Sequence, residues 1–403
     1  MRGLSSIETA AVEACSGFEM LGRVQTWSAI NSGSRNLQGL ASMAAVLADE
    51  FARLPGELAL REPAPADLMA ADGTISSLQH GANLHLKVRP EAPVQLLFTG
   101  HMDTVFGADH VFQSCQWLED GVLNGPGVAD MKGGIAVMLA ALQAVESASD
   151  PSRFGYEIII NSDEEVGSPG SAALIAEAAR GKSAALTYEP SALPDGTLAG
   201  ARPGSGNFSI LIAGKSAHAG RNPEEGRNAI VAAADLTLRL AKAKGPRLSV
   251  NPARIDGGGP NNVVPDLAIL RVNMRPFTPG DEQRAKAQLD AAVAMVAAEH
   301  EVKIQVHGGF GRPPKPLDAK AEKLFQLVKR CGADLGQAIQ WQASGGVCDG
   351  NNIAACGVPV VDTMGVRGGA IHSAQEYLIA DSLVERAQLS ALAILRLASG
   401  EDL

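Results

Sequence analysis

The chain has 403 residues, of which 46% are hydrophobic and 19% charged, with 34 Lys and Arg against 44 Asp and Glu. This length predicts two or three domains with a large buried core. The formal charge of −10 argues against a general nucleic-acid binder, which needs a basic surface to displace counterions. With only 3 Trp, 3 Tyr and 10 Phe, the chain also has few residues on which bases could stack. We expect no nucleic-acid partner.

The sequence predicts neither a membrane span nor a secretory leader. No uninterrupted apolar run reaches the roughly 18 residues of a spanning helix. Glu8 and Glu13 lie where a signal peptide would be apolar. The cysteines are odd in number and widely spaced, which is typical of reduced thiols rather than of a disulfide framework. They are Cys15, Cys115, Cys331, Cys348 and Cys356. We expect a cytoplasmic protein with no membrane partner.

Helical periodicity covers residues 20–55, with a break at Asn31–Ser34. After it, short apolar runs alternate with helical stretches. The predicted strands are Leu84–Val88, Val94–Phe98, Ile158–Ile160, Ala185–Thr187 and Val358–Val361, and the predicted helices are Ile135–Val145, Ala172–Ala179 and Leu383–Leu397. This alternation is typical of an α/β domain with a mostly parallel sheet that is covered on both faces.

Residues 203–312 follow a different order. The predicted elements are a strand, a helix, two strands, a helix and a strand, at Phe208–Ala213, Ala229–Ala243, Leu248–Ile255, Leu267–Met274, Gln283–Glu299 and Val302–Val306. A βαββαβ order is the ferredoxin-like arrangement. We therefore expect a discontinuous α/β domain, residues 1–202 and 313–403, with an inserted domain, residues 203–312, that two adjacent linkers join to it. We call the inserted domain the lid.

Acidic and imidazole side chains follow three of the predicted strands. His101 and Asp103 come after the strand at 94–98, Glu164 and Glu165 after the strand at 158–160, and Glu189 after the strand at 185–187. Ligands of open α/β sheets bind beyond the carboxyl ends of the strands. Any one of these acids alone could be a surface residue at a loop start. Together they would repel one another without a cation, and imidazole with carboxylate suits zinc or a neighbouring divalent ion.

Two glycine-rich segments add candidate ligands. Asp130 lies within Gly125–Gly134, just before an apolar helix, and His372 lies in the loop Gly368–Ser373. The first segment could be a phosphate-binding loop, but its spacing matches neither the dinucleotide fingerprint nor the P-loop. We therefore expect a tight turn that presents Asp130 as a ligand. The remaining histidines match no motif and are interpreted as structural: His80, His85, His110, His300 and His307.

In their order, these motifs resemble those of the M20 metallopeptidases, a family of co-catalytic zinc amidohydrolases. The motifs are His101–Asp103, Gly125–Gly134, Asp163–Ser168, Tyr188–Pro190 and His372. The resemblance covers roughly residues 20–400 and is greatest to the glutamate carboxypeptidase branch. That branch shares three lid motifs in the same order, namely Ser216–Gly220, Asn262–Pro265 and Gly311–Pro313.

The resemblance implies two zinc ions per subunit, for which Co²⁺ or Mn²⁺ could substitute. Asp130 would bridge both ions, His101 and Glu189 would complete one site, and Glu165 and His372 the other. The peptide bond from Asp130 to Met131 would be cis, as is typical of the family.

The resemblance also implies roles beyond metal binding. Glu164 would be the general base that activates a metal-bridging water, and Asp103 would fix the tautomer of His101. His218 would reach the site of the partner subunit in a homodimer formed through the lid, and would stabilise the oxyanion beside Asn262. Two arginines would bind a substrate carboxylate, although linker salt bridges are the alternative for both: Arg275 and Arg312.

The expected reaction is hydrolysis of an amide bond next to a free carboxylate, by a carboxypeptidase or an N-acyl amino acid deacylase. Its substrate would be a small acyl-amino acid or peptide. A dipeptidase or aminopeptidase of the same fold is the first alternative, and a catalytically silent metal-binding scaffold is the second. One departure from the family pattern concerns the substrate pocket, because Cys348 stands where relatives often carry Ser or Thr.

Overall fold

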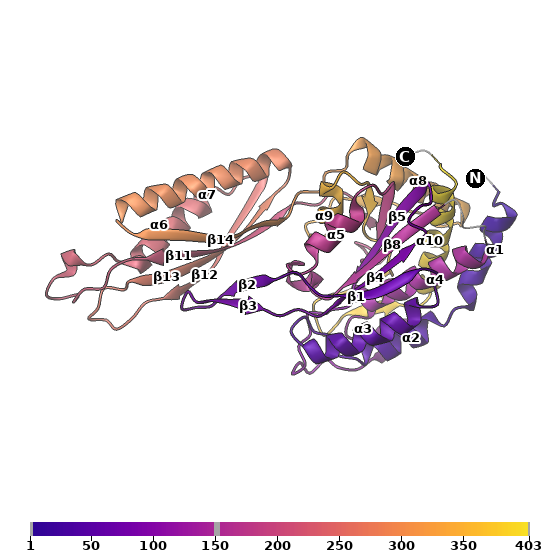
Figure 1. Ribbon diagram of the computed structural model, residues 1–403, viewed down its shortest axis with the longest axis horizontal. Coiled ribbons are helices and arrows are strands. Elements are labelled where there is room, and N and C mark those ends of the chain that lie inside the picture. Colours follow the sequence, from indigo (N-terminus) through magenta and orange to yellow (C-terminus); the bar gives the residue numbers. More distant parts are fainter. Residues whose placement is uncertain (1–2, 149–153, 402–403) are drawn as a thin grey trace.

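The computed structural model describes residues 3–148 and 154–401. It consists of a larger domain, on the right in Figure 1, and an elongated lid on the left. The larger domain is built around a six-stranded sheet and the lid around a four-stranded one. This arrangement confirms the expected fold class, an α/β domain with a ferredoxin-like insertion.

The central sheet is mixed, and its parallel part carries the candidate ligands. In spatial order its strands are β1 (Glu57–Arg61), β4 (Asn83–Val88), β8 (Phe154–Asn161), β5 (Val94–His101), β9 (Ala184–Thr187) and β16 (Val360–Val361). The last four run parallel to one another, whereas β1 and β4 pair antiparallel. The pattern did not predict β1, because this edge strand is mostly exposed and its apolar run covers only residues 58–60.

Helices cover both faces of this sheet. They are α1 (Ser6–Ala14), α2 (Met20–Ser28), α3 (Leu37–Phe51), α4 (Gly134–Ala148), α5 (Ala172–Ala179), α8 (Ala319–Asp334), α9 (Asp349–Ala355) and α10 (Ser382–Ala398). Leu96 and Phe98 belong to the core that includes α4 and α10, while Leu97 belongs to the core with α5 and α9. Successive residues of β5 therefore face opposite layers, as the predicted apolar runs require.

The segment Val128–Ala148, which contains α4, is long and apolar enough to cross a membrane by length and composition. The sequence pattern did not flag it. In the structure, 94% of its apolar window is buried inside the protein. Its composition is accounted for by its place in the core, where it packs against α1 and α10.

Short strands complete the larger domain. A small antiparallel sheet has the order β17 (Gly368–Gly369), β18 (Tyr377–Ile379), β7 (Val122–Asn124) and β6 (Gln116–Glu119), and a two-stranded pair joins β10 (Leu198–Ala199) to β15 (Trp341–Gln342). The hairpin of β2 (Ala66–Met69) and β3 (Ile75–Leu78) extends to the lid (Figure 1). There Arg271 donates a hydrogen bond to the carbonyl of Met69 at 2.9 Å.

The lid has a core of its own. Its elements are β11 (Ser205–Ala213), α6 (Ala229–Lys242), β12 (Leu248–Gly257), β13 (Leu267–Pro276), α7 (Pro279–Glu299) and β14 (Lys303–Arg312). The sheet order is β12-β13-β11-β14, with every pair antiparallel. Alternate residues such as Ile210 and Leu270 pack against α6 and α7 through Leu236 and Leu289. From the strand order, the edges of this sheet are β12 and β14.

Two buried side chains of the larger domain hold both linkers. Asp362 accepts hydrogen bonds from Arg202 at 2.8 and 3.0 Å and lies 2.8 Å from the Nζ of Lys315. Asn351 donates to the carbonyls of Pro203 and Pro313, at 2.9 and 2.8 Å. Both side chains are fully buried, and each binds one residue of the linker that enters the lid and one of the linker that leaves it. The two linkers are therefore held next to each other.

We expect Asp362→Asn to destabilise the protein by about 3–5 kcal/mol, because it leaves two buried cations without their anion. Burial alone would raise the pKa of Asp362, but Arg202 and Lys315 lower it from 3.8 to about 2. The stabilisation is therefore present above pH 4 or so and is lost as the pH falls toward 2.

Denaturant unfolding at several pH values measures both effects. Asp290→Asn, which breaks an exposed pair with Lys286, is the matched control and should change the stability by under about 1 kcal/mol. Equal effects of the two substitutions would contradict the assignment of Asp362 as a buried anchor.

Candidate active site

The predicted ligands come together at the carboxyl ends of the parallel strands. His101 ends β5, the pair Glu164 and Glu165 follows β8, and Glu189 follows β9. Asp130 lies in the turn before α4, and the peptide bond that follows it is cis, as the resemblance implied. His372 comes from the loop after β17.

Asp130 lies between two imidazoles. Its Oδ1 is 3.1 Å from the Nε2 of His101, and its Oδ2 is 3.3 Å from the Nε2 of His372. Each imidazole nitrogen also faces a second carboxylate, with Glu189 at 3.7 Å from His101 and Glu165 at 3.1 Å from His372. The arrangement has two halves that share one carboxylate.

The donor set fits divalent cations. Ligand atoms of His101, Asp130 and Glu165 lie within 4.8 Å of one another, and so do those of His101, Glu164 and Glu189. Burial, with the neighbouring charge of Asp130, raises the pKa of Glu165 to about 7. Hydrogen bonds to Asp130 and Glu165 raise the pKa of His372 to about 11. Such crowding of buried carboxylates is what bound cations relieve, and imidazole with carboxylate suits zinc or manganese.

Asp103 supports both the imidazole and the acidic turn. Its carboxylate accepts hydrogen bonds from the backbone N–H groups of Glu164 and Glu165, at 3.1 and 3.2 Å, and from the hydroxyl of Ser34 at 2.6 Å. The Nδ1 of His101 is 3.0 Å from the Asp103 carbonyl and 3.4 Å from its carboxylate. The closest partner of the ring is thus a main-chain carbonyl. No sequence pattern indicated Ser34.

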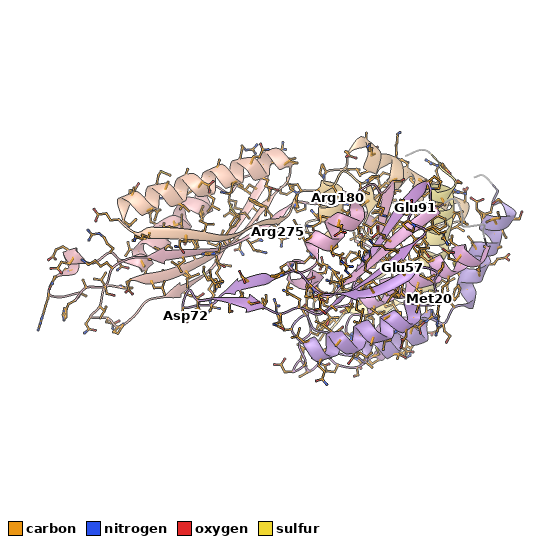
Figure 2. All side chains as sticks on the ribbon, viewed as in Figure 1. Met20, Glu57, Asp72, Glu91, Arg180 and Arg275 are labelled. Carbon is orange, nitrogen blue, oxygen red and sulfur yellow. The ribbon has the colours of Figure 1, made fainter. Side chains whose placement is uncertain are left out.

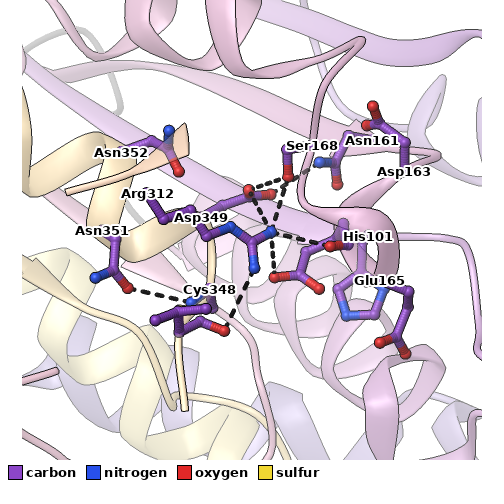
Figure 3. Close-up of polar contacts among 12 residues, drawn as sticks. His101, Asn161, Asp163, Glu165, Ser168, Arg312, Cys348, Asp349, Asn351 and Asn352 are labelled. Carbon is purple, nitrogen blue, oxygen red and sulfur yellow. Dashed lines mark hydrogen bonds and ion pairs between the residues drawn. The ribbon is translucent and has the colours of Figure 1, made fainter. Parts of the chain in front are cut away.

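Arg312, the last residue of β14, reaches from the lid to Glu164. Its Nη2 lies 2.7 Å from a carboxylate oxygen of Glu164 and donates to the Glu164 carbonyl and to Ser168, both at 2.9 Å. The same nitrogen is 3.4 Å from Asp349 (Figure 3). Burial raises the pKa of Glu164 well above its usual range, and the charge of Arg312 opposes that shift. Asp349 is a further site residue that sequence analysis missed, and Ser168 ends one of the motifs but was given no role there.

Cys348 lies beside this cluster (Figure 3). It is buried at the start of α9, and its backbone N–H donates to Asn351 at 3.1 Å. Burial raises the pKa of its thiol well above the usual value, so the side chain is uncharged. It therefore presents a neutral thiol to its surroundings rather than a thiolate.

The other lid residues lie apart from the candidate metal ligands of their own chain. His218 is exposed and belongs to the loop 214–228 between β11 and α6. This loop lies at the end of the lid away from the larger domain (Figure 1). Its Nδ1 accepts hydrogen bonds from the N–H groups of Gly220 and Arg221, both at 3.1 Å, which places the ring proton on Nε2. Asn262 is next to it, because its carbonyl accepts from Ala219.

Arg275 lies at the opposite end of the lid, near the larger domain (Figure 2). It donates to the carbonyl of Gly345 at 3.0 Å and to Asn273 at 3.1 Å. Its side chain thus bridges the lid and a loop of the larger domain, and it is partly exposed.

Comparisons with known proteins agree with this geometry. The model of peptidase family M20/M25/M40 matches residues 97–396. The chain is 31% identical over 332 residues to carboxypeptidase G2 from Pseudomonas sp. (strain RS-16), covering 80% of this chain and 78% of that protein. It is 28% identical over 330 residues to succinyl-diaminopimelate desuccinylase from Psychrobacter sp. (strain PRwf-1), covering 76% and 80%.

Solved structures show the same fold. The aminopeptidase PepT from Bacillus cereus superposes with a TM-score of 0.71 at 25% identity, covering 94% of this chain and 98% of that one. An M20 family metallo-carboxypeptidase from Sulfolobus solfataricus also gives 0.71, at 14% identity with 95% and 100% covered. The chain therefore belongs to the M20 peptidase family. It is a metallohydrolase that cleaves amide bonds.

We expect Arg312→Ala to lower kcat about 100-fold with a smaller change in KM, because Glu164 loses the group that fixes its position. Steady-state kinetics with an N-acyl amino acid that the wild-type enzyme hydrolyses would measure both constants. Arg330→Ala, on the exposed side of α8, is the control for loss of a guanidinium. A raised KM with unchanged kcat would instead support carboxylate binding by Arg312.

Proposed function

We propose that this enzyme is a dizinc hydrolase that cleaves an amide bond next to a free carboxylate. The observation that carries the proposal is the place of Asp130 between two imidazoles, each backed by another carboxylate. One ion would be held by His101 and Glu189, the other by Glu165 and His372, with Asp130 shared. When bound, the ions would polarise the scissile carbonyl and acidify a water molecule.

Glu164 is the proposed general base. It is adjacent in sequence to the ligand Glu165, and its carboxylate is buried beside His101 and Glu189. Its raised pKa suits a group that takes a proton from the attacking water and passes it to the leaving amine. Arg312 keeps the carboxylate aimed through its contacts with the side chain and carbonyl of Glu164.

We expect Glu164→Gln to retain bound metal while kcat falls by about 10²–10⁴-fold, because the amide cannot accept the proton. Removal of the metal with a chelator should abolish the activity of the wild type, and added zinc should restore it. Metal content and turnover are measured together, with the exposed Glu91→Gln as the control. A metal-free Glu164→Gln variant would show that Glu164 is a ligand rather than the base.

Substrate recognition is assigned to Arg275 of the lid, which is partly exposed where the lid meets the larger domain. Arg312, the other expected carboxylate ligand, is buried and bonded to Glu164, so we assign it to holding that side chain. A guanidinium can bind a carboxylate in two places, which suits a substrate with a free α-carboxylate. The carboxypeptidase and desuccinylase relatives support such a substrate.

Two alternatives can be tested with one panel of substrates. The aminopeptidase structure favours a dipeptidase or aminopeptidase, which would need a free amino terminus. A silent metal-binding scaffold is disfavoured by the intact Glu164. A panel of N-acyl amino acids, dipeptides and their C-terminal amides, assayed with added zinc, separates all three. We also propose a cytoplasmic location, since all five cysteines are free thiols.

We further propose a homodimer in which His218 completes the site of the partner subunit. The fixed tautomer leaves the Nε2–H of His218 free to donate, which suits stabilisation of an oxyanion, with Asn262 beside it. The edges of the lid sheet, β12 and β14, are available for pairing between two copies.

Mixed dimers of His218→Ala and Glu164→Gln subunits test this arrangement. Each variant alone should be nearly inactive. After random reassembly about a quarter of the wild-type rate should return, because half of the dimers are mixed and each has one intact site. Each variant reassembled with itself is the control. An inactive mixed dimer, verified by mass, would mean that His218 does not act across the interface.

A further inference from the structure

Glu376 is a buried carboxylate that the mechanism above does not use. It is 1% exposed and lies four residues after His372. Its Oε1 accepts hydrogen bonds from the backbone N–H groups of Ala129 and Asp130, at 2.9 and 3.0 Å, and its Oε2 accepts from Gly127 at 3.2 Å. One side chain thus satisfies three main-chain donors of the turn that carries the shared ligand.

The turn needs an outside acceptor. Asp130 has φ −114° and ψ 91°, which is not helical, and the regular helix α4 begins only at Gly134. Buried N–H groups without a partner are costly, and donors ahead of a helix have no carbonyl one turn earlier. A carboxylate also suits this position because the N-terminus of α4 is the positive end of its dipole.

Glu376 also ties this turn to the His372 loop. Its carbonyl accepts from the Nδ2 of Asn124 at 2.6 Å and from the N–H of Gly125 at 3.3 Å. The residue is therefore bonded through both side chain and main chain to the segment 124–130. Since His372 is in the same loop, these bonds fix the distance between His372 and Asp130.

Lys132 holds the other side of the same turn. Its buried Nζ donates to the carbonyls of Trp27 and Ile30, at 3.1 and 2.9 Å, at the end of α2. The turn is thereby anchored to α2 by Lys132 and to the His372 loop by Glu376. The rotation of the Asp130 peptide is constrained from both sides.

We propose that Glu376 is a positioning residue of the metal centre, which holds the Asp130 turn so that the two carboxylate oxygens face His101 and His372 before an ion binds. This inference rests on the proposed function. Ligands held in place lose less freedom on binding, so the role of Glu376 is to raise metal affinity. Because the hydrogen bonds of the Glu376 side chain go to the Asp130 turn and not to the proposed base, its loss acts through Asp130.

The test compares Glu376→Ala and Glu376→Gln with the wild type. Zinc affinity is measured by competition with a chromogenic chelator, and kcat and KM are measured at limiting and saturating zinc. Glu376→Ala should bind zinc about 10–100-fold more weakly, with activity largely recovered at saturating zinc and KM unchanged. Glu376→Gln should lie between, because its amide keeps an acceptor for Ala129 and Asp130 but turns an N–H group toward Gly127. Gln375→Ala, at the exposed neighbouring position, is the control for disturbance of the loop.

The outcomes separate this inference from the proposed function. Folded variants with the zinc affinity of the wild type would overturn the role of Glu376 and leave the function standing. A Glu376→Gln variant that stays unfolded at saturating zinc would also overturn it, because metal binding should stabilise a protein whose fold is otherwise intact. A wild-type protein that binds no divalent metal would overturn the proposed function, and the inference with it.

Discussion

The site depends on one electrostatic constraint, the burial of several carboxylates at the end of one sheet. Asp130, Glu164 and Glu189 are each less than a tenth exposed, and Glu165 joins them through its buried side chain. Isolated buried charges of one sign are strongly unfavourable. Two kinds of groups offset this negative charge. His101 and Arg312 lie against the carboxylates, and backbone N–H groups donate to Asp103 and Glu376. The remaining excess of negative charge is what makes the place a receptor for cations.

The lid is part of this balance. Arg312 ends the last strand of the lid and contacts Glu164, while the linkers on either side are held by Asp362 and Asn351. Any rotation of the lid about those anchors moves the guanidinium relative to the base. The hairpin of β2 and β3 adds a second connection, because Gly73 at its tip packs against Leu211 of the lid. The position of the lid and that of the proposed base, Glu164, are thus linked through Arg312.

Much of the site could be predicted from sequence because its ligands directly follow apolar strands or lie in glycine-rich loops. The ligand roles, the base and the lid residues came from the resemblance and stay predictions. Ser34, Asp349 and Glu376 could not be predicted, since their partners are main-chain groups or distant side chains and a single sequence shows no pattern for such contacts. The strands that were missed are of two kinds. Some are exposed, like β1, and others have only two to four residues, like those beside the His372 loop. Strands of that length are too short to show apolar alternation.

The two domains divide the chemistry between them. The candidate metal ligands and the proposed base come from the larger domain, where they lie at strand ends or in the loops and turns between elements. The candidate substrate contacts come from the lid or its linker, and one of them, Arg275, bridges to a loop at Gly345. Substitutions on the lid surface can then change the substrate specificity while the chemistry of amide cleavage stays the same, because the two are carried by different elements. Because Arg312 ends a strand of the lid yet contacts Glu164, a change at the lid can reach the proposed base through this residue.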